Sequence, residues 1–481
     1  MGEKRARTLA LRVLVLLVVA SICAFLAAKP AHADTTFTVD TSDDPDLTTT
    51  PTADDCTEAT ANDCSLRGAI NVANNTSGAD TIDFAIPDDP TTTADDVKTI
   101  LVDGKDDSTS IDLPVINEAV TIDGYSQTGA SANTNTELKD GTNANLLIEL
   151  NGAFVFGLSS GLLQINASDV VVKGLVLRCY NTGISIQHGG SRAVIEGNFI
   201  GTDPDGTTAT CQANTGVNVF GGGANTIGGK EPAARNLISG NLGRGLSIAD
   251  NGGNTIKGNL IGTKANGTEP LGNGREGVEI FSPNNTVGGD DTDSDNAGEG
   301  NRIAFNGSDG VQVLGGRNNP FAVGNRILYN SIFSNGNLGI DLDGGPGFSN
   351  PDADGVTTND RRDRDTGPNT LQNFPRLTSA TTADPGITTI KGTLNSRPRK
   401  TFLIQFFSSA TTNSAGFAEG KTFVGQLTKK TNREGKLAFT HRTVLPTGEN
   451  LVTATATSLD TSTTPATLID TSEFSRAVTA S

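Results

Sequence analysis

The sequence predicts an all-β protein in which a parallel β-helix solenoid is followed by a small antiparallel β-sandwich. The first observation is a four-residue phrase that recurs six times between Gly183 and Leu342, in steps of 33, 29, 32, 33 and 29 residues. The second is a pair of Asn-opened phrases between successive copies, such as NTIKG at Asn254 and NLIGT at Asn259. The third is a change of period after residue 375. Repeats of this length cannot bury a core alone and are typical of stacked solenoids.

Each copy of the phrase reads Gly, apolar, polar, apolar, which predicts a short strand with its apolar side chains inward. The six copies are GISI at Gly183, GVNV at Gly216, GLSI at Gly245, GVEI at Gly277, GVQV at Gly310 and GIDL at Gly339. Together with the two Asn-opened phrases, they give three strands per coil.

Asparagines recur at two corners of the predicted coil. One register holds Asn225, Asn254, Asn285 and Asn325, and the next holds Asn198, Asn236, Asn259, Asn301 and Asn330. Stacked about 4.8 Å apart, such side chains can form a hydrogen-bonded ladder along the axis. Asn also tolerates the left-handed backbone of tight corners. The alternative, that Asn and Gly only mark turns, explains single positions but not two sustained registers.

Residues 1–33 predict a secretory signal peptide. A basic start at Lys4, Arg5 and Arg7 precedes an apolar run from Val13 to Ala28 and a small-residue cleavage site ending at Ala33. The alternative is an N-terminal membrane anchor. No later stretch is long or apolar enough to span a bilayer. We therefore expect a secreted or cell-surface protein with no membrane span once the signal is removed.

Residues 34–112 predict an N-terminal cap containing one helix. Ser65 can serve as N-cap, and Leu66, Ala69, Ile70 and Ala73 share one helical face. Such a helix would cover the open end of the β-helix. In an exported chain, Cys56 and Cys64 indicate a disulfide, with metal binding as the alternative. Cys179 and Cys211 precede equivalent strands of adjacent coils, which predicts a second disulfide.

The stretch CSLRGAINVAN, from Cys64 to Asn74, resembles the bacterial CSLREA domain of secreted β-helix proteins. The phrases NTIGG, RNLISGN and GNLIGT, with TIDGYSQTGA at Thr121, extend the resemblance over roughly residues 37 to 375. The resemblance implies export and a right-handed parallel β-helix similar in shape to pectate lyases. It does not imply any particular enzymatic activity. The family motif has Glu where this chain has Gly68. Either the helix lacks a capping box there, or the first coil packs against the bare glycine.

The remaining chain divides into two predicted domains. Residues 113–375 form the β-helix, and residues 344 to 375 within it are a linker or a last irregular turn. Residues 376–481 contain short strands parted by turn residues, and resemble the immunoglobulin-like β-sandwich modules of other exported proteins.

The net charge and the aromatic content limit the classes of partner that we expect. The formal charge is −18 overall and −22 after residue 33, with 31 basic and 53 acidic residues. Such a surface repels polyanions unless a divalent cation bridges them, so we expect no nucleic acid partner. The chain has no Trp and only three Tyr. This scarcity of aromatic platforms argues against a carbohydrate enzyme.

The outward third residues of the glycine phrases are the candidate catalytic row, comprising Ser185, Asn218, Ser247, Glu279, Gln312 and Asp341. Glu279 and Asp341 lie two coils apart, about 10 Å, near the upper end of the carboxylate separation in inverting glycosidases. Asp250 and Asp343 are candidate flanking acids. Arg275 near Glu279 is the one pairing suited to a lyase. The alternative is a polar, solvated face without chemistry.

Two acidic loops predict calcium, because alternating oxygen ligands with a Gly at the bend suit a hard cation. The first loop offers Asp291, Asp293 and Asp295. The second offers Asn350, Asp352, Asp354, Asp360, Asp363 and Asp365. Neither has the closing Glu of an EF-hand, and the alternative is a solvated acidic turn. Calcium is the only cofactor that the sequence indicates.

Two functions fit this pattern. One is an exported, non-catalytic surface or matrix protein whose β-helix presents a binding face to a polysaccharide or cell-surface glycan. The other is a polysaccharide lyase or an inverting glycoside hydrolase on the same scaffold.

Overall fold

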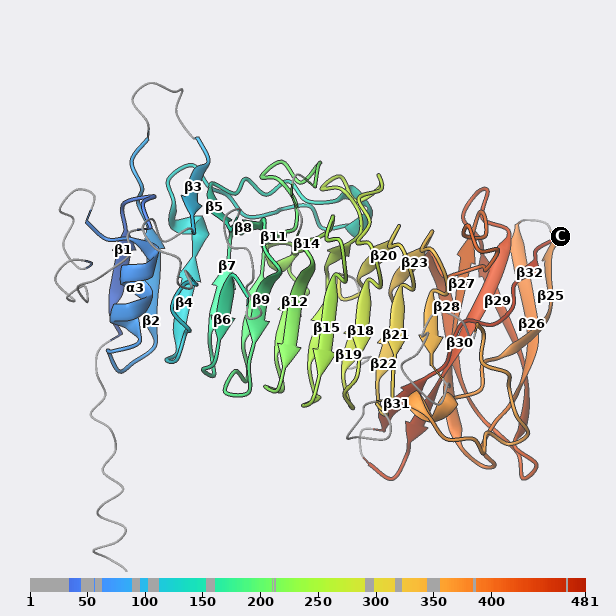
Figure 1. Cartoon of the computed structure of the whole chain (residues 1–481). Coiled ribbons are helices and arrows are strands. Elements are labelled where there is room, and N and C mark those ends of the chain that lie inside the picture. Colours follow the sequence, from blue (N-terminus) through green and yellow to red (C-terminus); the bar gives the residue numbers. More distant parts are fainter. Residues whose placement is uncertain are drawn as a thin grey trace, which may run out of the picture.

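The computed structural model describes residues 34–44, 56, 63–88, 96–102, 112–152, 161–209, 211, 213–289, 298–315, 322–343, 355–383, 386–463 and 466–481. The predicted signal peptide, residues 1–33, lies outside them. Three long parallel sheets stack into a β-helix-like solenoid, and antiparallel sheets follow at its C-terminal end (Figure 1). Within the described residues, no helix has the length and apolar character needed to cross a membrane.

Each coil contributes up to one strand to each parallel sheet, as the sequence predicts. The first sheet contains β1 (Thr36–Val39), β2 (Asp80–Phe84), β4 (Val120–Asp123), β7 (Val171–Lys173), β10 (Val194–Glu196), β13 (Thr226–Gly228), β16 (Thr255–Lys257), β19 (Thr286–Gly288) and β22 (Arg326–Leu328). The second contains β3 (Lys98–Leu101), β5 (Ile148–Asn151), β8 (Leu175–Arg178), β11 (Phe199–Ile200), β14 (Leu237–Ile238), β17 (Leu260–Ile261), β20 (Arg302–Ala304) and β23 (Ser331–Phe333). The third contains β6 (Leu163–Ile165), β9 (Thr182–Ile186), β12 (Thr215–Phe220), β15 (Leu246–Ala249), β18 (Val278–Ile280), β21 (Val311–Val313) and β24 (Ile340–Leu342).

The recurring glycine of the third sheet has a steric cause. A Cβ atom placed on Gly183, Gly216, Gly245, Gly277 or Gly310 would lie 2.6 or 2.7 Å from the carbonyl oxygen of the equivalent glycine one coil further on. The apolar residues that follow these glycines pair in register and are fully or almost fully buried in one continuous core. Close coil stacking therefore requires glycine at this position.

Asparagine ladders occupy the corners. In both predicted registers the Nδ2 of one Asn donates to the Oδ1 of the next, over 2.9 to 3.2 Å. A third ladder, which the sequence analysis missed, links Asn241, Asn273, Asn306 and Asn335 over 2.8 to 2.9 Å. Its signal was available, since each of these residues stands four positions before a repeat glycine.

The expected backbone role of these asparagines is wrong. In the first register the left-handed residue is the one before each Asn: Ala224, Gly253, Asn284 and Gly324, with φ between 59° and 80°. Each ladder Asn itself keeps a negative φ, because its side chain and its backbone N–H must both face the neighbouring coil. At these corners one residue makes the bend, and the Asn that follows it makes the hydrogen bonds.

The parallel sheets begin earlier than the sequence analysis expects, because β1, β2 and β3 precede Leu113. Helix α3 (Leu66–Ala73) contacts β1 and β2, and Ser65 accepts a hydrogen bond from the Gly68 N–H at 3.1 Å. Both predicted disulfides are present. Their Cα atoms are 4.9 Å apart in the pair Cys56–Cys64 and 5.1 Å apart in the pair Cys179–Cys211. They are consistent with an extracellular protein.

Residues 376–481, the C-terminal module, contain two antiparallel sheets. One holds β25 (Arg376–Ala383), β26 (Ile387–Asn395) and β29 (Lys436–Val444); the other holds β27 (Thr401–Ser409), β28 (Thr422–Lys430), β30 (Leu451–Asp460), β31 (Thr467–Thr471) and β32 (Val478–Thr479). Side chains of both sheets share one apolar core. Short 3₁₀ turns elsewhere are η1 (Gly124–Ser126), η2 (Leu138–Asp140), η3 (Pro232–Ala234) and η4 (Pro368–Leu371).

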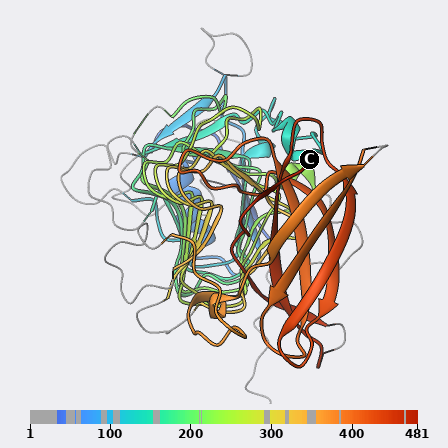
Figure 2. The ribbon, with the colours of Figure 1, turned by 90° about the vertical axis from the view of Figure 1, so that its right-hand side faces the viewer.

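The C-terminal module closes the last coil. In the end-on view the coils superpose, and the module lies at their near end, over one side of the stack (Figure 2). Three buried acids of the module accept hydrogen bonds from the coil. Glu419 accepts from Asn335 Nδ2 at 2.9 Å, Asp470 from the Gly324 N–H at 2.7 Å, and Glu473 from the Leu342 N–H at 3.2 Å. The exposed edge of a solenoid is thereby satisfied.

Candidate functional site

The polar row of the third sheet has the predicted register. Ser185, Asn218, Ser247, Glu279, Gln312 and Asp341 align from strand to strand. Gln164 of β6 extends the row by one coil. The glycine pattern does not identify Gln164, because its phrase, LLQI, lacks the opening glycine.

The expectation that this row is solvated is wrong at its acidic end. Glu279 and Asp341 are each 2% exposed, and Gln312 is fully buried. The reason is that neighbouring coils place polar partners over these groups. Ser247 Oγ donates to Glu279 Oε2 at 2.9 Å, and Gln312 Nε2 donates to Asp341 Oδ2 at 3.1 Å. The two carboxylates are thus bound within the protein, with Gln312 between them.

Arg244, which the sequence pattern did not single out, forms ion pairs with Glu279 and Glu276. Its Nε lies 2.7 Å from Glu279 Oε2 and 3.0 Å from Glu276 Oε2. Arg275, the predicted partner of Glu279, lies with its Nη2 3.4 Å from Glu276 Oε1, and its charge also lowers the pKa of Glu279. The sequence positions could have predicted this ion pair, because Arg244 and Glu276 each stand just before a repeat glycine on adjacent coils.

Burial raises the pKa of Glu279 to about 7, even though Arg244 acts in the opposite direction. The nearby Glu276 adds to the rise. A carboxyl with this pKa holds its proton part of the time at neutral pH, as a general acid does. Of the candidate flanking acids, Asp343 is 9% exposed, and Asp250 Oδ2 lies 3.7 Å from Nε2 of His188.

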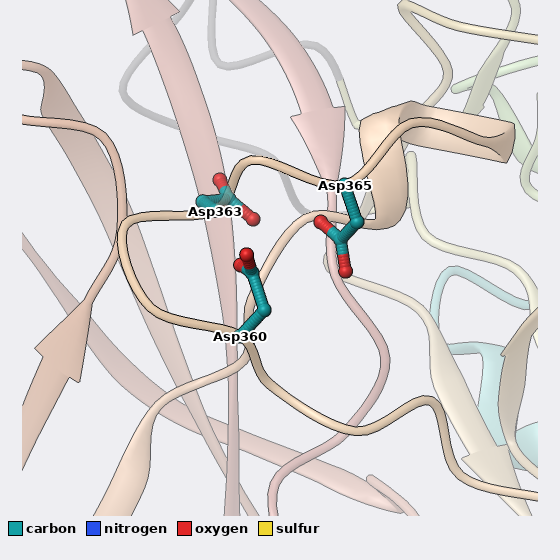
Figure 3. Close-up of side chains that lie close together, drawn as sticks. All are labelled: Asp360, Asp363 and Asp365. Carbon is teal, nitrogen blue, oxygen red and sulfur yellow. The ribbon is translucent and has the colours of Figure 1, made fainter.

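The structure brings together part of the predicted calcium loop. Asp360, Asp363 and Asp365 each offer a carboxylate oxygen within 4.8 Å of the other two, and the three side chains turn toward a common space (Figure 3). The other predicted ligands, Asp291, Asp293, Asp295, Asn350, Asp352 and Asp354, lie outside the described residues.

The hydrogen bonds of this acidic cluster leave one buried oxygen without a donor. Asp360 accepts from the Arg364 N–H at 3.1 Å, and Asp363 accepts from the Asn373 N–H at 2.9 Å and from Ser396 Oγ at 2.6 Å. Asp365 Oδ1 is buried and has no hydrogen-bond partner. An all-oxygen set with an unpaired buried acceptor fits a hard cation such as calcium.

The electrostatics of the cluster favour a cation. Burial raises the pKa of Asp363 to about 6. Burial and then the nearby Asp360 raise the pKa of Asp365. A divalent ion would relieve both effects, because it replaces lost solvation and offsets the repulsion between the carboxylates.

Two adjoining grooves lie where the last coil meets the C-terminal module. Their volumes are about 550 and 410 Å³. Val356, Arg476 and Ala477 line both. Aromatic side chains contribute Phe417 and Phe474 to the larger groove and Phe374 to the smaller, which also holds Arg376. The grooves could not be predicted from the sequence, because their walls come from five separate segments of the chain.

No family model matches this chain, and no curated protein matches it at a significant level. The resemblance to the CSLREA domain and the immunoglobulin-like module therefore remains a prediction from the motifs.

Proposed function

We propose that this chain is an exported, non-catalytic binding protein. In this proposal a right-handed parallel β-helix, with helix α3 as its N-terminal cap and an immunoglobulin-like module at its other end, forms a rigid scaffold for a polysaccharide or cell-surface glycan. The observation that carries the proposal is the burial of Glu279 and Asp341, each 2% exposed and hydrogen-bonded to the protein's own side chains.

A catalytic acid or base must come within hydrogen-bond reach of its substrate. Glu279 is enclosed by Ser247 and Arg244, and Asp341 by Gln312. A sugar ring between the two acids would have to displace Gln312, which pairs with both flanking strands. The row is better explained as internal support of the third sheet.

The grooves at the junction support binding. Volumes of about 550 and 410 Å³ lie in the range of small-molecule sites. Arg376 and Arg476 are exposed there, so their guanidinium groups can donate to hydroxyls or carboxylates. The walls come from both the solenoid and the module, and the hydrogen bonds across the junction hold them in place.

One observation favours the alternative of a lyase or an inverting hydrolase, namely the pKa of about 7 for Glu279. That value suits a general acid at neutral pH. The substitution Glu279→Gln separates the two functions, because it removes the proton donor and keeps the shape of the side chain.

The test is a panel of neutral and anionic polysaccharides, assayed for binding and for new reducing ends or unsaturated products, with calcium and with chelator. We expect the protein to bind a polysaccharide without releasing cleavage products. Arg476→Ala should weaken this binding about tenfold, a typical loss for one good polar contact. Arg442→Ala, an exposed change outside the grooves, is the matched control. Cleavage that disappears in a folded Glu279→Gln variant would establish the enzyme instead.

A further inference from the structure

The C-terminal module has a charge opposite to that of the rest of the chain. Residues 376–481 contain 12 Lys and Arg against 7 Asp and Glu, a formal charge of +5 within a protein of −18. The preceding residues therefore carry −23. A single value for the whole chain conceals this division.

Burial increases the contrast at the surface. Among the described residues of the module, four acids are buried: Glu419, Glu449, Asp470 and Glu473. Three of them bind the last coil. The exposed basic residues are Arg376, Lys391, Arg397, Arg399, Lys429, Lys430, Arg433, Lys436, Arg442 and Arg476. Among the acids of the module that the structure describes, only Glu434 is exposed, and Asp460 is half-buried. Three of the acids are therefore bound at the junction, and most of the basic residues are exposed to solvent.

Many of the bases gather at one end, because three loops meet there. The Arg399 N–H donates to the Asn432 carbonyl at 3.1 Å, and Thr431 Oγ1 donates to the Arg397 carbonyl at 2.6 Å. The loop of the acidic cluster joins them, since the Arg362 N–H donates to Asn395 Oδ1 at 3.3 Å.

We call residues 360–365, 396–400 and 429–436 the basic end. It contains ten basic residues, namely Arg361, Arg362, Arg364, Arg397, Arg399, Lys400, Lys429, Lys430, Arg433 and Lys436. Its four acids are Asp360, Asp363, Asp365 and Glu434, and Asp363 is buried with its Oδ2 3.9 Å from Arg397 Nε. The formal charge of the basic end is +6.

We propose that the basic end binds an anionic polysaccharide. The proposal rests on the proposed function and deepens it by assigning the class of glycan and a surface for it. Clustered Arg and Lys attract a chain of regularly spaced carboxylate, phosphate or sulfate groups, and Arg can hold each group through two hydrogen bonds. It corrects the expectation that polyanions are excluded, because that expectation used the charge of the whole chain.

Two features of the protein favour a polysaccharide over a nucleic acid as the ligand of the basic end. The acidic solenoid beside the basic end repels duplex DNA strongly, because DNA carries one charge per ~1.7 Å. The basic end also lacks aromatic side chains on which bases could stack. A polysaccharide with one charge per sugar has a lower charge density and needs no stacking.

The basic end also adjoins the smaller groove. Asn359 lines that groove; its Nδ2 donates to the Phe374 carbonyl, and its Oδ1 accepts from the Phe374 N–H. The next residue in the chain is Asp360 of the acidic cluster. A chain lying across the basic end therefore continues toward Arg376 and Arg476. The two surfaces together give a polymer more than one point of contact.

The experiment measures binding of polygalacturonate, neutral dextran and duplex DNA to the full chain between 50 and 200 mM salt. We expect polygalacturonate to bind, dextran to bind less tightly, and affinity to fall with salt. Lys430→Glu with Arg433→Glu should weaken polygalacturonate binding at least about tenfold and flatten its salt dependence. The control, Lys391→Glu with Arg442→Glu, makes the same charge change elsewhere on the module and should cost less than about twofold.

Equal losses in both double variants, or no loss in either, would overturn the proposal. So would tighter binding of DNA than of polygalacturonate. The neutral pair Lys430→Gln with Arg433→Gln, with melting temperatures of all variants, guards against misfolding and should give an intermediate loss. If glycans bind and the loss follows Arg476→Ala alone, the proposed function stands without the basic end. If no glycan binds at all, both fail.

Discussion

At the residue scale, the repeat is set by positions that face the neighbouring coil. The repeat glycines have no room for a Cβ atom, and the ladder asparagines donate to the next coil. In the first register the residue before each Asn makes the bend. Glu279 follows the same rule, since its carboxylate is bound by Ser247 of the preceding coil. Polar residues that the sequence pattern predicts to be exposed and catalytic therefore form contacts between coils.

The substitution Gly277→Ala should destabilise the solenoid by about 2 to 3 kcal/mol, the cost of overpacking a rigid site. Its Cβ would lie 2.7 Å from the Gly310 carbonyl oxygen and 2.8 Å from Asn306 Nδ2. Urea unfolding measures the change. Gly448→Ala is the control, because φ is 84° there but the space is open, and should cost only about 1 kcal/mol. Equal costs would show that sterics between coils are not the cause.

Glu419 makes stability depend on pH. Burial raises its pKa from 4.5 to about 7, while hydrogen bonds from Asn335 oppose the rise. The native state therefore holds a proton that the unfolded state releases, and the free energy of unfolding falls as pH rises from about 4.5 to about 7. The full difference is on the order of 3 kcal/mol.

Glu419→Gln keeps an acceptor for Asn335 and removes the titration. We expect the loss of unfolding free energy between pH 5 and pH 8 to be smaller in this variant than in the unmodified protein. Glu279 and Asp363, whose pKa values are also raised, will leave a remaining slope of the same sign. An identical loss in both proteins would show that Glu419 does not titrate in this window.

At the element scale, the loop carrying Asp360, Asp363 and Asp365 connects the last coil to the C-terminal module. It is held to the module directly through Ser396, which donates to Asp363, and indirectly through Asn373, which donates to Asp363 and to the Asn395 carbonyl. An ion bound there would tie the two parts together. The same loop supplies three arginines to the basic end, so its order matters for the proposed binding surface.

Calcium should raise the melting temperature through this loop. An ion that binds only the native state stabilises it by about 2.7 kcal/mol at one hundred times its dissociation constant. Asp365→Asn should abolish the effect, because Asp365 supplies the unpaired buried oxygen. Asp205→Asn, an exposed change in the solenoid, should leave it intact. A transition that does not respond to chelator would rule the site out.

The strands, both Asn registers, both disulfides and the helix after Ser65 could be predicted because each follows from spacing along the chain. The burial of Glu279 could not, since it depends on Arg244 and Ser247, which reach it from another coil. The grooves and the basic end could not either. Each is built from loops that only the folded chain brings together, and no period links them.

At the scale of the whole molecule, the chain combines an acidic solenoid with a basic module that closes its last coil. The buried acids of the module satisfy the edge of the solenoid, and Phe407 and Phe474 extend the solenoid core into the module. The grooves sit on this junction, and the basic end adjoins the smaller one. The proposed binding surfaces therefore lie where the two parts meet rather than along the face of the solenoid.

The most direct test of a non-catalytic binding role is the molar mass of a bound polysaccharide, measured by size-exclusion chromatography with light scattering. Polygalacturonate would be incubated with the protein and calcium for a day. We expect the two to elute together and the polymer to keep its length. A fall in molar mass that Glu279→Gln prevents would contradict it and assign catalysis to the third sheet.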